Sequence, residues 1–188
     1  MTIYLHMRER SVTTLGPGRR YAVWVSGCHR NCPGCIAPDS HDMTRGTPVD
    51  ADALAWEILL SGAEGLTISG GEPFLQAAAL AQMVQTVRQK RDLGVIVYTG
   101  FTYEELCRMP DAQPLLEQTD LLIDGPYIRE LDDGLSLRGS SNQRVIPLTE
   151  RYRQELPNYG TRPREQEIFH HAGTTHFVGI PTNSVYDI

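Results

Sequence analysis

Four short apolar runs, alternating with stretches that carry helix signals, most constrain the fold of this chain. Each run has five or six residues and is rich in β-branched or other apolar side chains, as expected of buried strands. Repeated strand–helix–strand order predicts a parallel α/β sheet, because parallel neighbours need a long crossover connection. The predicted strands are Tyr21–Ser26, Gly65–Ser69, Gly94–Thr99 and Asp120–Asp124.

The segments between these runs contain the expected start and stop signals of helices. Thr47 can cap a helix that ends at Gly62, with Pro48 at the first helical position and Asp50 reaching back as in a capping box. Two more helices are predicted: one over residues 75–90, and a short one over 103–109 after the capping-box pattern Thr102–Glu105.

The pattern weakens after residue 124. Residues 125–144 are expected to form a long loop, Val145 and Ile146 to begin a strand, and His176–Ile180 to form a last strand. A chain of 188 residues suits one domain with a single core. We therefore expect a single domain over residues 1–188, with no internal repeat.

Unusual polar or glycine-rich sequences follow the predicted strands. They are Cys28 after the first strand, Gly70–Pro73 after the second, Thr99 at the end of the third and Asp124 at the end of the fourth. The carboxyl ends of parallel strands meet at one edge of a sheet, where α/β proteins bind their ligands. The sequence therefore predicts one functional site at that edge.

Charge and hydropathy exclude several classes of partner. A net charge of -6 and a pI near 5.5 argue against general attraction to nucleic acid or to an anionic membrane. No apolar run approaches the roughly 20 residues that span a bilayer. The first residues lack the pattern of a signal peptide, so we expect the protein to be cytoplasmic, with no nucleic-acid or membrane partner.

Three of the four cysteines lie within eight positions, in the spacing C-x₃-C-x₂-C formed by Cys28, Cys32 and Cys35. A disulfide framework would spread its cysteines along the chain, whereas a compact trio in a reducing compartment indicates metal. Three local thiolates on a four-iron cube leave one iron without a protein ligand. An open coordination position is what a reactive centre needs, so we favour an open [4Fe–4S] cluster.

Two other metal sites fit the same cysteines. One is a Cys₃His zinc site completed by His29 or His41, although zinc ligands more often come as two separated pairs. The other is an electron-transfer cluster with Cys107 as its fourth ligand. Cys107 falls in a predicted helix and is expected to be an ordinary, partly buried thiol.

The cysteine trio followed by Gly-Gly-Glu-Pro resembles the radical S-adenosylmethionine (SAM) superfamily. Within it, the chain is similar to the small activating enzymes of anaerobic (class III) ribonucleotide reductase, over about residues 3–148. The segments that carry the resemblance are Trp24–Cys28, Cys32–Cys35, Leu66–Pro73, Val97–Leu106, Leu121–Tyr127 and Leu137–Arg144.

The resemblance implies an incomplete TIM-type α/β barrel and a radical SAM oxidoreductase. Its cofactors would be a [4Fe–4S] cluster and SAM, whose reductive cleavage gives methionine and a 5′-deoxyadenosyl radical. That radical would take hydrogen from a glycine of a partner glycyl radical enzyme, such as anaerobic ribonucleotide reductase. A flavodoxin or ferredoxin would supply the electron. Residues 149–188 lie beyond the resemblance and form a C-terminal extension whose role the resemblance does not indicate.

Site residues follow from the resemblance position by position. Cys28, Cys32 and Cys35 would be the cluster ligands and catalytic residues. Glu72 would accept a hydrogen bond from the methionine ammonium of SAM, with the neighbouring backbone close to it. The predicted cofactor-binding residues are Gly70, Gly71, Glu72, Pro73, Thr99, Asp124 and Arg138.

Plainer readings exist for these residues. The Gly70–Pro73 turn can be an ordinary strand-to-helix connection, Asp124 can cap the next turn, and Arg138 can belong to a structural ion pair. Asn142 and Arg144 can brace the long loop or face a partner. Two other functions also stay open: a radical SAM enzyme that modifies a small molecule or peptide, and a non-enzymatic iron–sulfur or zinc protein.

Overall fold

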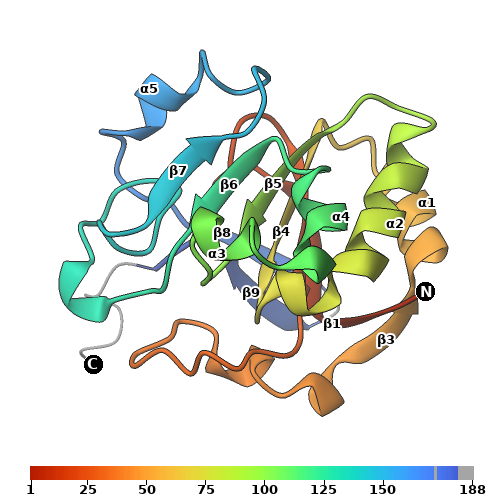
Figure 1. The fold of residues 1–188 in the computed structure, drawn as a ribbon, viewed down its shortest axis with the longest axis horizontal. Coiled ribbons are helices and arrows are strands. Elements are labelled where there is room, and N and C mark those ends of the chain that lie inside the picture. Colours follow the sequence, from red (N-terminus) through yellow and green to blue (C-terminus); the bar gives the residue numbers. More distant parts are fainter. Residues whose placement is uncertain (172, 182–188) are drawn as a thin grey trace.

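The computed structural model describes residues 1–171 and 173–181, so residues 182–188 of the expected extension lie outside the described part. A seven-stranded sheet in the order β3-β1-β2-β4-β5-β6-β7 forms the centre (Figure 1). Its strands are β1 (Thr2–Val12), β2 (Arg20–Val25), β3 (Thr47–Asp50), β4 (Gly65–Gly70), β5 (Gly94–Tyr98), β6 (Leu121–Asp124) and β7 (Arg144–Pro147). The C-terminal extension adds a hairpin of β8 (Glu167–His171) and β9 (Thr174–Val178).

The four predicted strands correspond to β2, β4, β5 and β6, and these neighbours pair in parallel as predicted. The flanking strands β1, β3 and β7 pair antiparallel to their neighbours. The protein is therefore mixed α/β, with a parallel centre. The predicted strand starts at Val145 and Ile146 are confirmed in β7, and the last predicted strand corresponds to β9.

The first four α-helices cover one face of the sheet, and the fifth, within the extension, packs on the other face. The α-helices are α1 (Ala51–Leu60), α2 (Ala77–Arg88), α3 (Tyr103–Leu106), α4 (Gln113–Leu116) and α5 (Leu156–Tyr159), and 3₁₀ turns are η1 (Pro38–Ser40), η2 (Met43–Arg45), η3 (Pro73–Gln76), η4 (Pro110–Ala112) and η5 (Arg129–Leu131). Figure 1 shows α1, α2 and α4 on the same side. Among the described residues, no helix has the length and hydropathy to cross a membrane.

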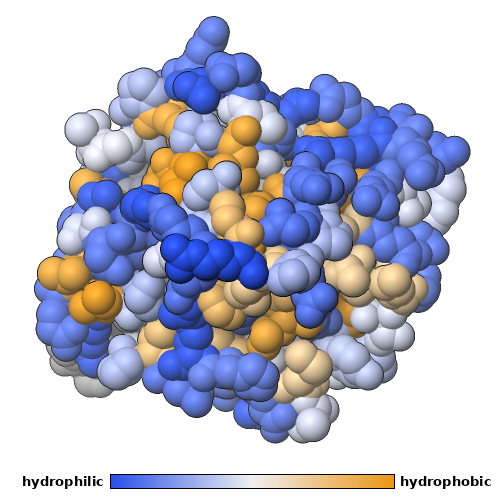
Figure 2. All heavy atoms as spheres, in the orientation of Figure 1, coloured by the Kyte–Doolittle hydropathy of each residue, from blue (hydrophilic) through white to orange (hydrophobic). Residues whose placement is uncertain are grey.

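The sheet has an apolar core on both faces. Val95 and Val97 pack in the core under the helices, whereas Ile96, between them on β5, packs with Tyr152 of the extension. Successive residues of a strand point to opposite faces, and a strand covered on both faces is apolar throughout. The extension therefore covers the face of the sheet that the helices leave free. Polar side chains dominate the surface seen in Figure 2, with apolar patches near its centre.

The predicted helix start at Thr47 was wrong. Residues 47–50 form β3, an edge strand paired with β1, and α1 begins only at Ala51. Asp50 is the N-cap, and its carboxylate accepts hydrogen bonds from the backbone N–H groups of Asp52 (3.0 Å) and Ala53 (3.1 Å). Pairing with β1 overrode the local helix signal of residues 47–50. The sequence did not predict β1 itself, whose pairing with β2 is irregular and contains two register shifts.

Other helix predictions were closer. Gly62 follows the end of α1 with a φ of +69°, the left-handed position expected there. The capping box of Thr102 and Glu105 at the start of α3 is confirmed. The long helix predicted over 75–90 begins two residues later, at Ala77, because Pro73 starts a separate 3₁₀ turn.

The N-cap assignment can be tested by comparing two alanine substitutions. Asp50→Ala removes the acceptor for two N–H groups of α1, so we expect the melting temperature to fall by about 3 °C. Thr47→Ala, in the exposed edge strand, is expected to change it by less than about 1 °C. Thermal unfolding followed by circular dichroism measures both. A larger fall in melting temperature for Thr47→Ala than for Asp50→Ala would instead support Thr47 as the helix cap, as predicted from sequence.

Candidate functional site

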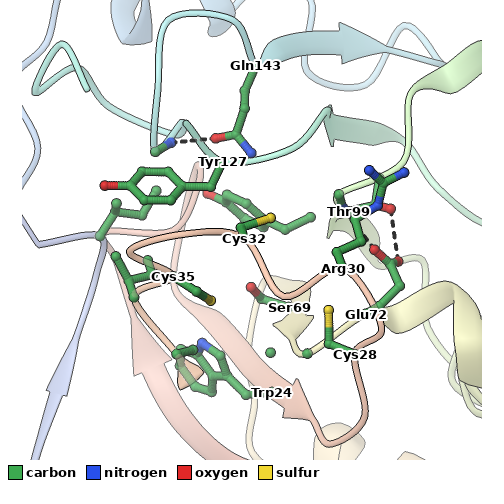
Figure 3. A pocket seen from close by; sticks show the side chains of 18 of the residues that line it. Trp24, Cys28, Arg30, Cys32, Cys35, Ser69, Glu72, Thr99, Tyr127 and Gln143 are labelled. Carbon is green, nitrogen blue, oxygen red and sulfur yellow. Dashed lines mark hydrogen bonds between the residues drawn. The ribbon is translucent and has the colours of Figure 1, made fainter. Parts of the chain in front are cut away.

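An open pocket lies at the carboxyl ends of the parallel strands, as the strand order predicts (Figure 3). All three cysteines of the trio line it, together with Gly70, Gly71, Glu72 and Thr99. The pocket therefore brings together seven of the ten predicted site residues. Pro73, Asp124 and Arg138 are the three that do not line it.

The cysteine loop is held by its own backbone. Gly27 N–H donates to Ser40 O (2.7 Å) and Cys28 N–H to His41 O (2.9 Å), which closes the loop at its base. At its tip, Cys35 N–H donates to Cys32 O (3.1 Å) across Gly34, which has a φ of +70°. A left-handed residue at a tight turn favours glycine, which is why glycine precedes the third cysteine here.

The three thiols are free and half-buried. Burial is the main cause that raises the pKa of the Cys28 and Cys35 thiols above the ordinary value. A thiolate in this pocket therefore needs a compensating positive charge, which bound metal supplies. The donor set is chemically suited to iron and sulfur.

The structure also bears on the two other metal sites. His29 is exposed, whereas His41 lines the pocket with Nε2 3.3 Å from the Cys35 Sγ. Within the described residues, no group of three or more His, Cys, Asp or Glu side chains is arranged to hold a metal ion. One zinc ion needs all its donors within about 2.0–2.3 Å of a point, whereas a cube binds each thiolate on a separate iron. Cys107 was predicted to be partly buried, but it is exposed and lies outside the pocket lining.

The Gly70–Gly71 turn packs directly against β2 and the start of the cysteine loop. A Cβ added to Gly70 would lie 2.2 Å from Val25 N, and one added to Gly71 would lie 2.3 Å from Gly27 O. Gly71 N–H donates to Val25 O and the next N–H, of Glu72, donates to Gly27 O, both at 2.7 Å. Only glycine allows this approach, so both glycines are required by the contact between turn and loop.

Glu72 is a buried carboxylate in the wall of the pocket, 1% exposed. It accepts hydrogen bonds from Phe74 N–H (3.1 Å), the Thr99 hydroxyl (2.9 Å) and Gly100 N–H (2.9 Å). Burial raises the pKa of Glu72, and these donors together with Arg30 act in the opposite direction. Glu72 thus joins the ends of β4 and β5, and Figure 3 shows it next to Thr99.

Thr99 and Arg30 surround this carboxylate. The Thr99 hydroxyl also accepts a hydrogen bond from Phe101 N–H (3.0 Å), so its hydrogen-bonding capacity is largely used within the turn. Arg30, from the cysteine loop, stacks over the Phe101 ring at 4.4 Å and donates to Glu105 (3.1 Å). Arg30 lines the pocket, and its position between two cysteines was the signal that sequence analysis did not use.

Asp124 and Arg138 occupy structural positions beside the pocket. Asp124 accepts a hydrogen bond from Tyr103 N–H (2.7 Å) at the start of α3 and forms an ion pair with Arg144. Arg138 pairs with Asp133 and lines a second cavity, next to the first. These contacts match the plainer readings of both residues.

Asn142 and Arg144 brace the long loop between β6 and β7, which was one of their two readings. Asn142 donates to Pro126 O (2.8 Å), and Arg144 bonds to both Asp124 and Glu104. Pro73 is buried at the start of η3, behind the turn.

Several pocket residues were missed from sequence. Three of them are strand residues on the face of the sheet that the extension covers: Trp24 of β2, Ser69 of β4 and Tyr98 of β5. The alternation of side chains along each strand was the signal that could have found them. The remaining lining residues that were not predicted lie in loops between and after the strands: Leu15, Ile36, Ala37, His41, Gly100, Gly125, Tyr127, Gly139, Gln143, Gly179 and Ile180.

Comparison with known proteins places this chain in a family. The family model of the 4Fe-4S single cluster domain matches residues 14–146. The anaerobic ribonucleoside-triphosphate reductase-activating protein of Vibrio cholerae is 36% identical over 143 residues, which cover 71% of this chain and 91% of the relative. The chain belongs to this family of activating proteins.

Other anaerobic ribonucleoside-triphosphate reductase-activating proteins are also similar to this chain. The Haemophilus influenzae protein is 36% identical over 138 residues, covering 68% of this chain and 87% of the relative. The Escherichia coli K12 protein is 30% identical over 140 residues, covering 69% and 89%. Among solved structures, QueE from Escherichia coli aligns with a TM-score of 0.48 at 12% identity, over 65% of this chain and 70% of that chain.

The raised pKa of Glu72 has a consequence for stability that can be measured on the apo protein. A carboxyl group whose pKa is higher in the folded state binds more protons there than in the unfolded chain. Stability therefore falls as pH rises from the ordinary value of 4.5 through the raised pKa. We expect Glu72→Gln to remove that part of the pH dependence, as measured by urea unfolding at a series of pH values.

The control is Glu64→Gln, which changes an exposed carboxylate that accepts a hydrogen bond from Arg19 N–H (2.6 Å). Its profile should keep the slope of the wild-type profile over that range. Identical slopes for wild type and Glu72→Gln would show that burial does not govern the titration of this carboxyl group.

Proposed function

We propose that this protein is a radical SAM activating enzyme that generates a glycyl radical on anaerobic ribonucleotide reductase. The observation that carries the proposal is the shared pocket, in which three free thiols face a buried carboxylate turn at the ends of parallel strands. Membership of the activating family supports the same reaction. The names of the relatives indicate the partner, an anaerobic ribonucleoside-triphosphate reductase.

Cys28, Cys32 and Cys35 would hold the [4Fe–4S] cluster. Their thiols are free and half-buried and line one pocket, which fits a cluster that uses three protein thiolates. When bound, the cluster supplies the electron with which SAM is cleaved at a C–S bond into methionine and a 5′-deoxyadenosyl radical. The loop backbone keeps the three thiols together at the strand ends.

Glu72 would bind the ammonium of SAM. A carboxylate offers about four acceptor positions, and the protein fills three of those on Glu72. A buried carboxylate with one position left and a nearby pocket is suited to a charge-assisted bond with an ammonium group. Gly70, Gly71 and Pro73 would act by shaping the turn that carries Glu72.

Thr99, Asp124 and Arg138 stay predictions as cofactor contacts. Thr99 would act by holding the Glu72 carboxylate, to which it donates at 2.9 Å. Asp124 and Arg138 would act through the loops that they anchor, since neither lines the pocket.

Apolar side chains would exclude water from the reacting molecule. Trp24, Tyr98 and Ile180 line the pocket on the side opposite the helices. A reactive radical survives only where water and other hydrogen donors are kept away, and correct placement of the reacting atoms adds to the rate. The protein's contribution is therefore positioning and enclosure.

The remaining features of the proposal follow from the resemblance. The seven-stranded sheet would be the incomplete TIM-type barrel of a single domain, with its core at residues 3–148. A flavodoxin or ferredoxin would donate the electron in the cytoplasm.

The alternative function is a radical SAM enzyme that acts on a small molecule or peptide. The contribution of Gly179 and Ile180 to the pocket favours this alternative, since the extension then completes a substrate site.

The proposal is tested by anaerobic reconstitution of the cluster, reduction with dithionite and addition of SAM. We expect about four iron atoms per chain, formation of 5′-deoxyadenosine and, with the anaerobic reductase present, a glycyl radical signal in electron paramagnetic resonance. Cys32→Ala should abolish the product. The exposed Cys107→Ala is the matched control and should retain iron and activity.

The possible results separate the functions. Product without a glycyl radical on the reductase would favour the small-molecule or peptide enzyme. A colourless, zinc-containing protein would contradict both and leave a structural metal site. Loss of the cluster in Cys107→Ala would instead favour an electron-transfer centre with four cysteine ligands.

A further inference from the structure

The C-terminal extension supplies part of the pocket wall. Gly179 and Ile180, directly after β9, line the pocket. Gly179 has a φ of +118°, and a Cβ added there would lie 2.5 Å from Glu165 O, so this wall is closely packed. The family model ends at residue 146, and the Vibrio relative aligns over 91% of its own length but only 71% of this chain. The family match therefore leaves this wall unexplained.

One buried arginine joins the wall to the rest of the pocket. The side chains of Arg164 and Asp132 are only 2% and 4% exposed, and they form an ion pair. The same guanidinium donates to Pro181 O (2.7 Å), to Gly139 O (3.1 Å) and to Leu135 O (3.1 Å). A planar guanidinium with five donors is suited to such a junction, whereas a lysine is not.

Two of these acceptors belong to the pocket wall. Gly139 lines the pocket itself, and Pro181 follows Ile180, which also lines it. Gln143 supports the same place, since its side-chain oxygen accepts a hydrogen bond from Gly139 N–H (2.7 Å), as Figure 3 shows. Arg164 thus links a wall segment from the loop to a wall segment from the extension.

The backbone docks the extension independently of this side chain. Ser136 N–H donates to Arg162 O (2.8 Å), and Arg164 N–H donates to Gly134 O (2.9 Å). These bonds remain when the Arg164 side chain is replaced. What the side chain adds is the connection onward to Gly139 and Pro181, so its loss should loosen the wall more than the fold.

We propose that Arg164, with Asp132, is a positioning residue that fastens the extension as a wall of the pocket and thereby sets the affinity for SAM. Without the guanidinium, Gly139 O and Pro181 O lose their donor, which releases the two wall segments. The buried Asp132 carboxylate also loses its counter-charge and will turn toward water. The identity of the ligand rests on the proposed function. The fastening of the wall does not.

The test compares Arg164→Met with Arg162→Met in the reconstituted full-length protein. The two substitutions remove the same charge two residues apart, but Arg162 is 44% exposed and pairs with the exposed Glu165. We expect Arg164→Met to raise the KM for SAM in 5′-deoxyadenosine formation about tenfold, with kcat within about twofold of wild type. Arg162→Met should leave both constants within about twofold.

Hydrogen–deuterium exchange provides a readout that does not need activity. Arg164→Met should lose amide protection in residues 139–143 and 178–180 together, while the Ser136 amide, which donates to Arg162 O, stays protected. Arg162→Met should keep the protection of all these amides. Asp132→Asn, which retains the side-chain shape and the three carbonyl bonds of Arg164, should raise KM in the same direction but less. If Arg164→Met fails to fold, the KM and the amide protection of Asp132→Asn test the proposal instead.

The outcomes distinguish this proposal from the proposed function. If the wild-type protein makes no 5′-deoxyadenosine, the proposed function fails and the exchange pattern alone decides the role of Arg164. Unchanged protection and unchanged KM in Arg164→Met would overturn the inference. A lower melting temperature with unchanged KM would also overturn it, because that result describes a residue that only stabilises the fold.

Discussion

Two backbone hydrogen bonds at the ends of β2 and β4 control the geometry of the whole site. Gly71 N–H bonds to Val25 O and Glu72 N–H bonds to Gly27 O, so the turn after β4 continues the parallel pairing into the base of the cysteine loop. These bonds place the residue before Cys28 directly against the residue before Glu72. The cysteine loop and the buried carboxylate are therefore positioned by the sheet rather than by flexible side chains, which favours precise placement of a reacting molecule.

The strand ends are fastened by buried polar groups rather than by apolar packing. Glu72 connects β4 to the backbone after β5, and the Gln76 side chain connects β1 to β2 through Tyr4 and Ser26. In a medium of low dielectric constant such bonds are strong when complete and costly when a partner is missing. The edge that carries the cysteines is consequently cross-linked by polar bonds even though it opens to solvent.

The extension explains how a small sheet encloses its pocket. Helices α1–α4 cover one face, and Tyr152 and Ile180 of the extension pack on the other. A parallel sheet needs cover on both faces, and residues beyond the family match supply it here. The same residues then reach the pocket, so burial of the sheet and completion of the site are coupled in this chain.

Local sequence predicted the parts of the molecule that depend on local rules. The four parallel strands were recognisable from continuous apolar runs such as Val95–Val97, and the capping box of Thr102 and Glu105 from spacing alone. The cysteine trio and the Gly70–Pro73 turn were assigned to one edge because parallel strands end together. Residue types and order along the chain sufficed for these features.

Tertiary structure decided what depends on residues distant in sequence. Residues 47–50 became a strand because β1 offered an edge, and Asp124 took an ion-pair partner, Arg144, that lies 20 residues away in sequence. Arg164 reaches acceptors from residue 132 to residue 181. The amino-acid sequence alone specified where the cysteine trio and the Gly70–Pro73 turn lie and in which order the strands follow along the chain. Only folding determined which buried charges meet, because a buried ion pair depends on three-dimensional proximity.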